Sequence, residues 1–302
     1  MSIVVENLTK TYGKQNAVDH ISFKINSGEI VGFLGPNGAG KTTTMKILTC
    51  YLPPTSGKAF VNDLDVEEKS IEVRRQIGYL PEHNPLYTDM YVKEYLMFAA
   101  SVYHLPNKVQ RVNEMIALTG LEVEQRKKIG QLSKGYRQRV GLAQAMIHDP
   151  SVLILDEPTS GLDPNQIVEI RNLIINIGKH KTVLLSTHIM QEVEAMCSHV
   201  MIVNKGRIVA NGKPSELKQQ FSAGASLQVT FNAVLNDYQL QKLSEYGTVT
   251  HIGGSTYSII SQSDDEKLKS STFQFAVDNG LMLTEMKLIE HSLEDIFKNV
   301  TQ

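Results

Sequence analysis

The pattern of apolar and polar residues predicts a parallel sheet in the first two thirds of the chain. Several segments are almost wholly apolar over four or five residues, as in strands that are buried on both faces. They are Val31–Leu34, Ile77–Leu80, Val152–Leu155 and Val183–Thr187. Helical segments separate them, and a hairpin over residues 200–209 follows. This order predicts an α/β fold with a parallel core sheet.

The N-terminal segments have a different pattern. Ile21–Ile25 alternates apolar and polar residues, as a half-buried strand does. Ile3–Leu8 predicts another strand, with a turn at Lys10–Gly13, and Ala59–Val61 predicts a third after the break at Pro53–Gly57. This β-rich start predicts an antiparallel layer attached to the parallel core.

The region between the second and third core strands is predicted to be mainly helical, from about residue 92 to residue 147. Two apolar stripes at helical spacing are expected to face the core. They consist of Tyr95, Leu96, Phe98, Ala99 and Val102, and of Met115, Leu118 and Leu121. Asp163 and Pro164 later fit an N-cap and the first position of a further helix.

The pattern changes again after Lys213–Ser215. A helical bridge to about Gln220 leads into alternating strands and helices, which predict a small α+β domain of ferredoxin-like type. The strands are expected near Leu227–Phe231, Thr248–Ile252, Tyr257–Ile260 and Leu283–Lys287, and the helices near Gln239–Glu245, Glu266–Asn279 and Ser292–Asn299. We therefore expect two domains, one of residues 1–220 and an accessory one of residues 221–302.

Composition excludes only a few classes of protein. The 302 residues have a formal net charge of −2 at pH 7, so a general attraction to nucleic acid is not expected. The two cysteines, Cys50 and Cys197, fit no metal spacing and are expected to be inert thiols in a reducing compartment. No segment is apolar over the length that crosses a bilayer, so work at a membrane would need a separate spanning partner.

The stretch Gly35–Thr43 carries the strongest chemical signal. It follows an apolar strand and opens a helix, with two glycines flanking four residues before Lys41 and Thr42. Glycines let backbone N–H groups approach an anion closely, and the N–H groups at a helix start have no partner within the helix. This pattern predicts a phosphate loop in which Lys41 contacts phosphates and Thr42 offers a hydroxyl to Mg²⁺.

Two other core strands end in polar residues. Asp156 and Glu157 follow one strand, which we expect to neighbour the phosphate-loop strand, and His188 follows another. Ligands bind at the carboxyl ends of strands in open α/β sheets. A histidine alone in this position is more often structural, and a single Tyr12 in a turn is equally compatible with an ordinary surface residue. The paired carboxylates predict a metal contact and a general base.

The order of these motifs resembles that of the ATP-binding subunits of ABC transporters. The stretch Leu132–Arg139 resembles the ABC signature, which is the most discriminating motif of that family. The resemblance covers about two thirds of the chain. It implies a P-loop NTPase fold of ABC type, with a parallel core sheet, an antiparallel β subdomain and a helical subdomain of about residues 83–150.

The resemblance also implies roles for individual residues. Glu157 would be the general base, His188 would contact the γ-phosphate, and Lys41 would assist catalysis. Nucleotide contacts are implied for Tyr12, Gly35, Pro36, Asn37, Gly38, Ala39, Gly40, Lys41, Thr42, Thr43, Ser133, Gly135 and Asp163. Mg²⁺ contacts are implied for Thr42, Glu82 and Asp156. The cofactors would then be ATP and Mg²⁺.

Three positions differ from the residues that are most common in the family. Lys134 replaces a glycine, Tyr136 replaces a glutamine, and Glu82 replaces a glutamine that usually follows the second core strand. A carboxylate is still a hard oxygen ligand for Mg²⁺. The sequence of Gly78–Tyr87, together with the C-terminal extension, is similar to that of ATPases associated with bacterial gliding motility.

The leading hypothesis is an ATP-hydrolysing subunit that powers transport. A second copy would close over the nucleotide through Ser133 and Gly135, and separate transmembrane permease subunits would dock near His83–Val102, on the cytoplasmic side of the inner membrane. A soluble ABC-type ATPase acting on nucleic acid or ribosomes is the alternative, and a non-hydrolysing clamp is a third. The basic run around Lys134 has few interleaved aromatic residues, so no nucleic-acid partner is expected.

Overall fold

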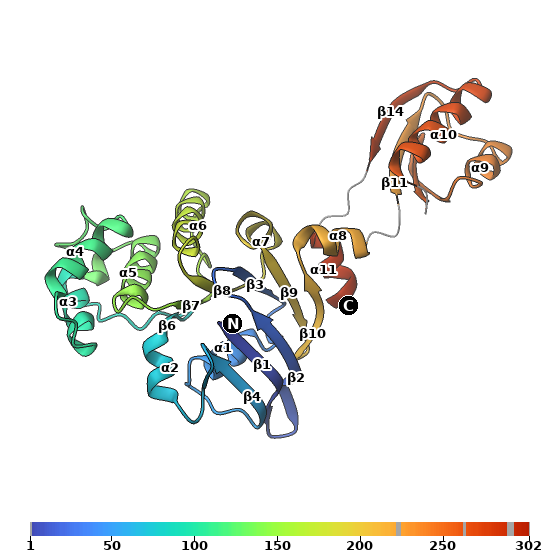
Figure 1. Cartoon of the computed structure of the whole chain (residues 1–302). Coiled ribbons are helices and arrows are strands. Elements are labelled where there is room, and N and C mark those ends of the chain that lie inside the picture. Colours follow the sequence, from blue (N-terminus) through green and yellow to red (C-terminus); the bar gives the residue numbers. More distant parts are fainter. Residues whose placement is uncertain (1, 222–224, 262–263, 289–292, 302) are drawn as a thin grey trace. The chain divides into compact units, whose positions relative to one another are not determined.

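The structure is a computed structural model that describes residues 2–221, 225–261, 264–288 and 293–301. The chain forms two compact units, Met1–Pro214 with Asn299–Gln302, and Ser215–Lys298 (Figure 1). Each unit has its own hydrophobic core. The last residues of the chain therefore return to the unit in which the chain begins.

The core of the first unit is a six-stranded sheet in the order β10-β9-β3-β8-β7-β6. Its strands are β3 (Ile30–Leu34), β6 (Ile77–Leu80), β7 (Val152–Asp156), β8 (Thr182–Thr187), β9 (His199–Asn204) and β10 (Arg207–Gly212). All neighbours are parallel except β9 and β10, which form the expected hairpin. The predicted core strands are thus confirmed. One expectation is wrong: β8 lies between β7 and β3, so the strand that ends in the carboxylates does not neighbour the phosphate-loop strand.

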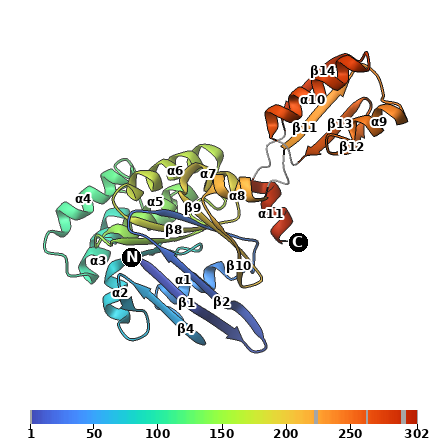
Figure 2. The same ribbon diagram turned by 45° about the vertical axis from the view of Figure 1, so that its right-hand side comes forward.

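A second, antiparallel sheet has the order β2-β1-β4-β5. It consists of β1 (Ile3–Tyr12), β2 (Gln15–Ile25), β4 (Ser56–Val61) and β5 (Leu64–Asp65). The turn expected at Lys10–Gly13 is wrong for its first three residues, because Tyr12 still pairs with Gln15 across a tighter hairpin. Helix α1 (Lys41–Leu48) lies between the two sheets, and its buried side chains join both in one core (Figure 2).

Helices complete the first unit. They are α2 (Ser70–Gln76), α3 (Val92–Val102), α4 (Lys108–Leu118), α5 (Lys134–Met146), α6 (Pro164–Gly178), α7 (Met190–Met196) and α8 (Pro214–Phe221), with a short 3₁₀ turn at Ile129–Gln131. The core assignment is wrong for three residues of the apolar stripes: Phe98 is 46% exposed, Val102 59% and Leu118 38%. Phe98 and Val102 lie on α3 and Leu118 ends α4, and the packing of these helices on each other and on α5 leaves the three side chains partly uncovered.

Helix α5 lies directly on strand β6. A Cβ atom on Gly78 would come within 2.2 Å of the carbonyl oxygen of Ala145, so the strand backbone touches the helix backbone. A Cβ atom on Gly141 would come within 2.6 Å of the Leu80 side chain. These close contacts join the strand that precedes Glu82 to the helix that begins after Ser133.

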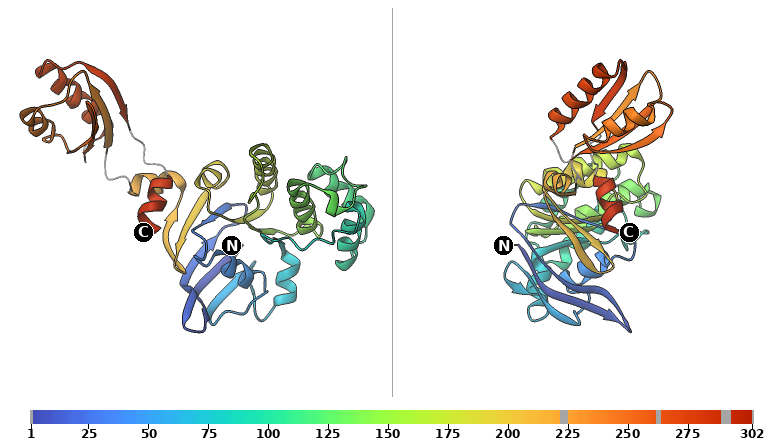
Figure 3. Two further views of the ribbon diagram at one scale, coloured as in Figure 1. Left: turned by 180° about the vertical axis from the view of Figure 1, so that it is seen from behind. Right: turned by 90° about the vertical axis from the view of Figure 1, so that its right-hand side faces the viewer.

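The second unit contains β11 (Ala225–Phe231), α9 (Asp237–Leu243), β12 (Thr248–Gly253), β13 (Thr256–Ser261), α10 (Asp265–Asp278) and β14 (Leu283–Leu288). Its antiparallel sheet has the order β12-β13-β11-β14. This is the split βαβ arrangement of a ferredoxin-like fold, as the sequence predicts (Figure 3). A final helix, α11 (Leu293–Thr301), ends at the first unit, where Asn204 Nδ2 donates to the Thr301 carbonyl oxygen at 3.1 Å.

Candidate nucleotide site

The loop between β3 and α1 is built from glycines for two different reasons. Gly38 and Gly40 have left-handed backbones with φ of 79° and 105°. Gly40 also lies so close to the Ala17 carbonyl oxygen that a Cβ atom would come within 2.3 Å of it. Gly35 has no positive φ. Its missing side chain instead allows the close approach of Val203, whose carbonyl oxygen would lie 2.5 Å from a Cβ atom.

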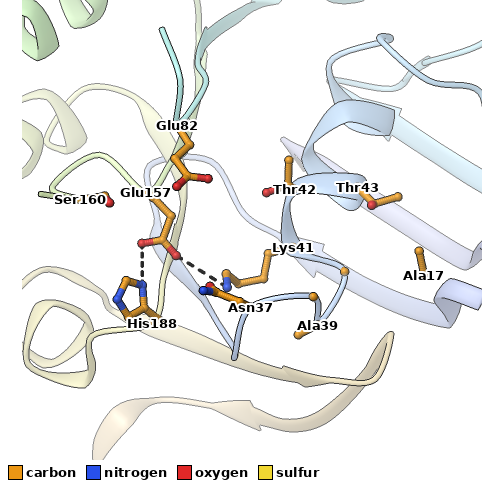
Figure 4. Close-up of a pocket in the computed structure, with 12 residues that line it drawn as sticks. Ala17, Asn37, Ala39, Lys41, Thr42, Thr43, Glu82, Glu157, Ser160 and His188 are labelled. Atoms are coloured by element: carbon orange, nitrogen blue, oxygen red, sulfur yellow. Dashed lines mark hydrogen bonds and ion pairs between the residues drawn. The ribbon is translucent and has the colours of Figure 1, made fainter.

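A cavity of about 460 Å³ lies over this loop. Its walls come from the phosphate loop, from β2 and from the segments that follow β6, β7 and β8 (Figure 4). The lining residues are Ala17, Asn37, Gly38, Ala39, Gly40, Lys41, Thr42, Thr43, Glu82, Glu157, Ser160 and His188. The fold therefore brings residues from five separate parts of the sequence to one cavity.

Lys41 is buried in this cavity, and its charge is held by three oxygens. Nζ donates to the carbonyl oxygens of Gly35 at 2.7 Å and Pro36 at 3.2 Å. It also lies 3.6 Å from Oε1 of Glu157. Lysine ammonium groups are seldom buried unless they are paired. The lysine is thus preorganised beside a carboxylate and beneath the backbone N–H groups of the loop.

The two carboxylate oxygens of Glu157 have different partners, an ion pair at Oε1 and a hydrogen bond at Oε2. Oε1 faces Lys41, while Oε2 accepts a hydrogen bond of 2.9 Å from Nδ1 of His188 (Figure 4). The backbone of Glu157 is left-handed, with φ of 49°, and its N–H donates to Oγ of Ser186 at 3.0 Å. Strained backbone of this kind is concentrated at functional sites. The geometry places a nearly buried carboxylate between two potential cations.

Asp156 lies just behind Glu157 and is only 1% exposed. Oγ of Ser186 donates to its Oδ1, whereas Oδ2 has no hydrogen-bond partner in the described part of the chain. A buried carboxylate oxygen without a donor suits a hard cation such as Mg²⁺. The hydroxyl of Thr42 and the carboxylate of Glu82 face the cavity nearby, so the donor set expected from the sequence is chemically suitable for that metal.

Comparison with known proteins identifies the family. A family model described as ABC transporter matches residues 18–160. The chain is 35% identical over 302 residues to the ABC transporter ATP-binding protein YxlF of Bacillus subtilis (strain 168), covering 98% of both chains. The chain belongs to the family of ABC transporter ATP-binding proteins. As a member of this ABC family it is an ATP-hydrolysing subunit of a transport system.

Two further ABC relatives bear on the site. The bacitracin transport ATP-binding protein BcrA of Bacillus licheniformis is 34% identical over 313 residues, with 98% of this chain and 97% of the relative covered. A solved structure of the ATP-binding cassette MJ0796, a post-hydrolysis dimer bound to ADP and Pi, has a TM-score of 0.64 and 25% identity. The structural match covers 70% of the present chain and 98% of the MJ0796 chain.

Seven residues of the predicted ABC site do not line the cavity: Gly35, Pro36, Asp156, Ser133, Gly135, Asp163 and Tyr12. Gly35 and Pro36 contact Nζ of Lys41 and Asp156 precedes Glu157, whereas the other four lie elsewhere in the fold. Ser133 is the N-cap of α5, and its Oγ accepts from the Tyr136 N–H at 3.3 Å, with Gly135 in the first turn of that helix. Asp163 caps α6 by accepting from the N–H of Gln166. Tyr12 is 50% exposed at the end of β1, and Nζ of Lys10 lies over its ring, 5.6 Å from the centroid. Their nucleotide contacts stay predictions.

Several polar residues of this ABC site are absent from the sequence-based set. Ser160 lines the cavity, and Ser186 bridges Asp156 and the backbone of Glu157. Glu192 accepts hydrogen bonds from two threonines behind the cavity. A serine directly after the apolar run Val183–Leu185 of strand β8 was the available signal for Ser186. A single glutamate in the first turn of α7 gives no comparable signal, because such a residue is usually a solvated helix position.

Proposed function

We propose that this ABC subunit hydrolyses ATP in the cavity above the phosphate loop and that hydrolysis drives transport through separate membrane subunits. The observation that carries the proposal is the fixed Glu157 carboxylate, which lies at the carboxyl edge of the sheet and faces Lys41. In this role Glu157 accepts a proton from the attacking water. Retention of this base disfavours a clamp that binds ATP without hydrolysing it.

The other residues prepare the triphosphate for attack. Lys41 and the free N–H groups of the loop bind phosphate oxygens, so we expect Nζ to exchange its carbonyl partners for phosphate. His188 orients Glu157 through their hydrogen bond and reaches the γ-phosphate with its outer nitrogen. When bound, Mg²⁺ neutralises charge on the phosphates, and Thr42, Glu82 and Asp156 would hold it.

A second copy of the chain completes the site. Ser133 and Gly135 lie at the start of α5, where unpaired N–H groups favour an anion. They lie outside the cavity of their own chain. The dimeric state of the MJ0796 cassette supports an arrangement in which these residues close over the ATP of the other copy.

Exposed aromatic residues of the helical subdomain fit a membrane partner. Tyr87 and Phe98 are both about half exposed, and their ring centroids lie 5.8 Å apart. They follow Glu82, which lines the cavity, so the patch is close in sequence to the site. No helix in the described residues meets the length and apolarity needed to cross a bilayer. We infer peripheral binding to permease subunits on the cytoplasmic face of the inner membrane.

The rival soluble ATPase acting on nucleic acid is less well supported. The basic run consists of Arg126, Lys127, Lys128, Lys134, Arg137 and Arg139. Within it, Lys127 pairs with Glu124, and Arg139 pairs with Glu169 and donates to the Thr119 carbonyl. These charges are partly neutralised within the fold. Phosphate release measured with permease-containing vesicles and, separately, with RNA distinguishes the two functions. We expect stimulation by vesicles, and stimulation by RNA alone would reverse the assignment.

The residues of the nucleotide site do not determine the transported substrate. The relative BcrA is named for bacitracin transport. Gliding motility, the narrower interpretation from Gly78–Tyr87, stays a prediction, because neither YxlF nor BcrA carries that name. Purification of the chain with its membrane partners, followed by their identification, addresses both questions.

Glu82 provides a test of coupling to the membrane partner. Its carboxylate faces the cavity while its loop leads to the exposed aromatic patch. We expect Glu82→Gln to alter turnover and to reduce stimulation by the permease about fivefold or more, within the usual range of coupling energies. Asp89→Asn, an exposed carboxylate of the same loop, is the control. Unchanged basal and stimulated rates in Glu82→Gln would remove this role.

The C-terminal unit provides a test of dimer control. We propose that it stabilises the dimer or gates the cycle, since it contains a separate core and the chain then returns to the first unit at Asn204. Ending the chain after Ala223 is expected to weaken ATP-dependent dimerisation, measured by sedimentation. A chain ending at Lys298 is the control, because it keeps the second unit and loses the contact between Thr301 and Asn204. Normal dimerisation, turnover and partner binding in the shorter chain would contradict the proposal.

A further inference from the structure

We propose that Glu192 is a positioning residue that fixes the His188 loop to the segment after Glu157. This role presupposes the hydrolytic site proposed above. Glu192 lies in the first turn of α7, outside the phosphate loop and the carboxylate pair. It does not line the cavity, and its two side-chain hydrogen bonds go to Thr159 and Thr187, so its effect would be transmitted through these neighbours.

Glu192 is a buried carboxylate held by two hydroxyl groups. It is 1% exposed. Oε1 accepts from Oγ1 of Thr159, and Oε2 accepts from Oγ1 of Thr187 at 2.8 Å. It forms no salt bridge within the described parts of the chain. Since a buried charge is costly without hydrogen bonds, these two threonines are what makes the position tolerable.

The contact with Thr187 fixes the backbone on both sides of His188. The same hydroxyl that donates to Glu192 accepts a hydrogen bond of 3.0 Å from the N–H of Ile189. The His188 side chain itself is half exposed, and its hydrogen bond in the structure is the one to Glu157. The direction of the imidazole therefore depends on how firmly its backbone is held.

The contact with Thr159 fixes the segment that carries the general base. Thr159 is two residues after Glu157, and the N–H of Ser160 donates back to the Glu157 carbonyl. The N–H of Leu162 donates to the Thr159 carbonyl, so residues 157–162 form a continuous turn. Through Thr159 and Thr187, Glu192 thus holds the two backbone segments that carry Glu157 and His188.

This arrangement predicts a particular kinetic signature. Loss of one threonine hydroxyl leaves the phosphate loop and Lys41 unchanged, so ATP should bind normally. The distance between His188 and Glu157 becomes less well fixed, and misplacement of a catalytic group lowers the rate of the chemical step. A residue with a purely structural role would instead lower thermal stability without a selective loss in kcat.

The experiment compares Thr187→Val and Thr159→Val in the full-length chain with two references. Thr187→Ser restores the hydroxyl, and Thr119→Val removes a buried hydroxyl that donates to a helix carbonyl of α4, far from the site in sequence. We expect both site variants to lose about tenfold in kcat, with ATP affinity within about twofold of the wild type. Thr187→Ser should recover most of the rate, and Thr119→Val should keep it.

A double-mutant cycle completes the test. In a His188→Ala background, Thr187→Val should cause little additional loss of kcat, because residues that act as a unit are not additive. The proposal is overturned if kcat of both valine variants matches that of Thr119→Val, or if Thr187→Val reduces the rate equally with and without His188. A wild-type chain that releases no phosphate would instead contradict the hydrolytic function itself.

Discussion

Glu157→Gln is expected to bind ATP and to lose at least about a hundredfold in turnover, the usual contribution of a general base. The amide keeps the size of the side chain and can still accept a hydrogen bond from His188 at one oxygen. It cannot take a proton from water, and it removes the negative charge beside Lys41. Because ATP then persists in the site, the variant should accumulate as a closed dimer.

Phosphate release and light scattering measure the two parts of this prediction on one sample. With Mg²⁺ and ATP the variant should show twice the monomer mass, and with ADP it should return to a monomer. Glu67→Gln, which changes an exposed carboxylate outside the cavity, should behave as the wild type. Retained turnover in Glu157→Gln would mean that another group is the base.

Lys41→Ala is expected to weaken ATP binding by about a hundredfold or more, which corresponds to the loss of a strong charge-assisted contact. The substitution removes the cation that the phosphate loop directs toward the ligand. It also leaves the nearly buried Glu157 carboxylate without its lysine partner, so negative charge opposes the incoming triphosphate. Turnover at cellular ATP concentrations should disappear with binding.

Calorimetric titration with ATP and Mg²⁺ measures this effect directly. Lys46→Ala is the matched control, because Lys46 lies on the same helix α1 but does not line the cavity. Circular dichroism of the apo chain should show both variants folded, with a lower melting temperature for Lys41→Ala because the buried Glu157 loses its lysine partner. Normal affinity in Lys41→Ala would show that the triphosphate binds somewhere other than the phosphate loop.

The core sheet and most of the site were predictable from local sequence. Strands buried on both faces are continuous apolar runs, and polar residues at their carboxyl ends stand out against them. The positions of Lys41, Glu157 and His188 follow from this rule. The wrong neighbour assigned to β7 did not change the predicted site, because the carboxyl ends of all parallel strands lie at the same edge of the sheet.

The remaining features depend on contacts that local patterns do not encode. Glu192 is buried only because α7 packs beside the ends of β7 and β8 and brings it to two threonine hydroxyls. Phe98 fits a core position by its spacing, yet nothing in the spacing of one helix specifies how many neighbours will cover it. Gly35 is needed for contact with Val203, which is distant in sequence.

The signature residues Ser133 and Gly135 are a different case. Their helix start can be described from one chain, but their proposed ligand is bound to another copy. The resemblance of Leu132–Arg139 to the ABC signature was therefore the only sequence-based reason to place them at the nucleotide. A second molecule is needed to test that placement.

The most direct measurement is an experimental structure of the Glu157→Gln dimer with ATP and Mg²⁺. We expect each triphosphate to lie against Lys41 of one copy and within hydrogen-bond distance, about 3 Å, of Ser133 Oγ or the Gly135 N–H of the other. ATP bound at the phosphate loop, with Ser133 and Gly135 remote from the nucleotide in every assembly, would contradict the shared site.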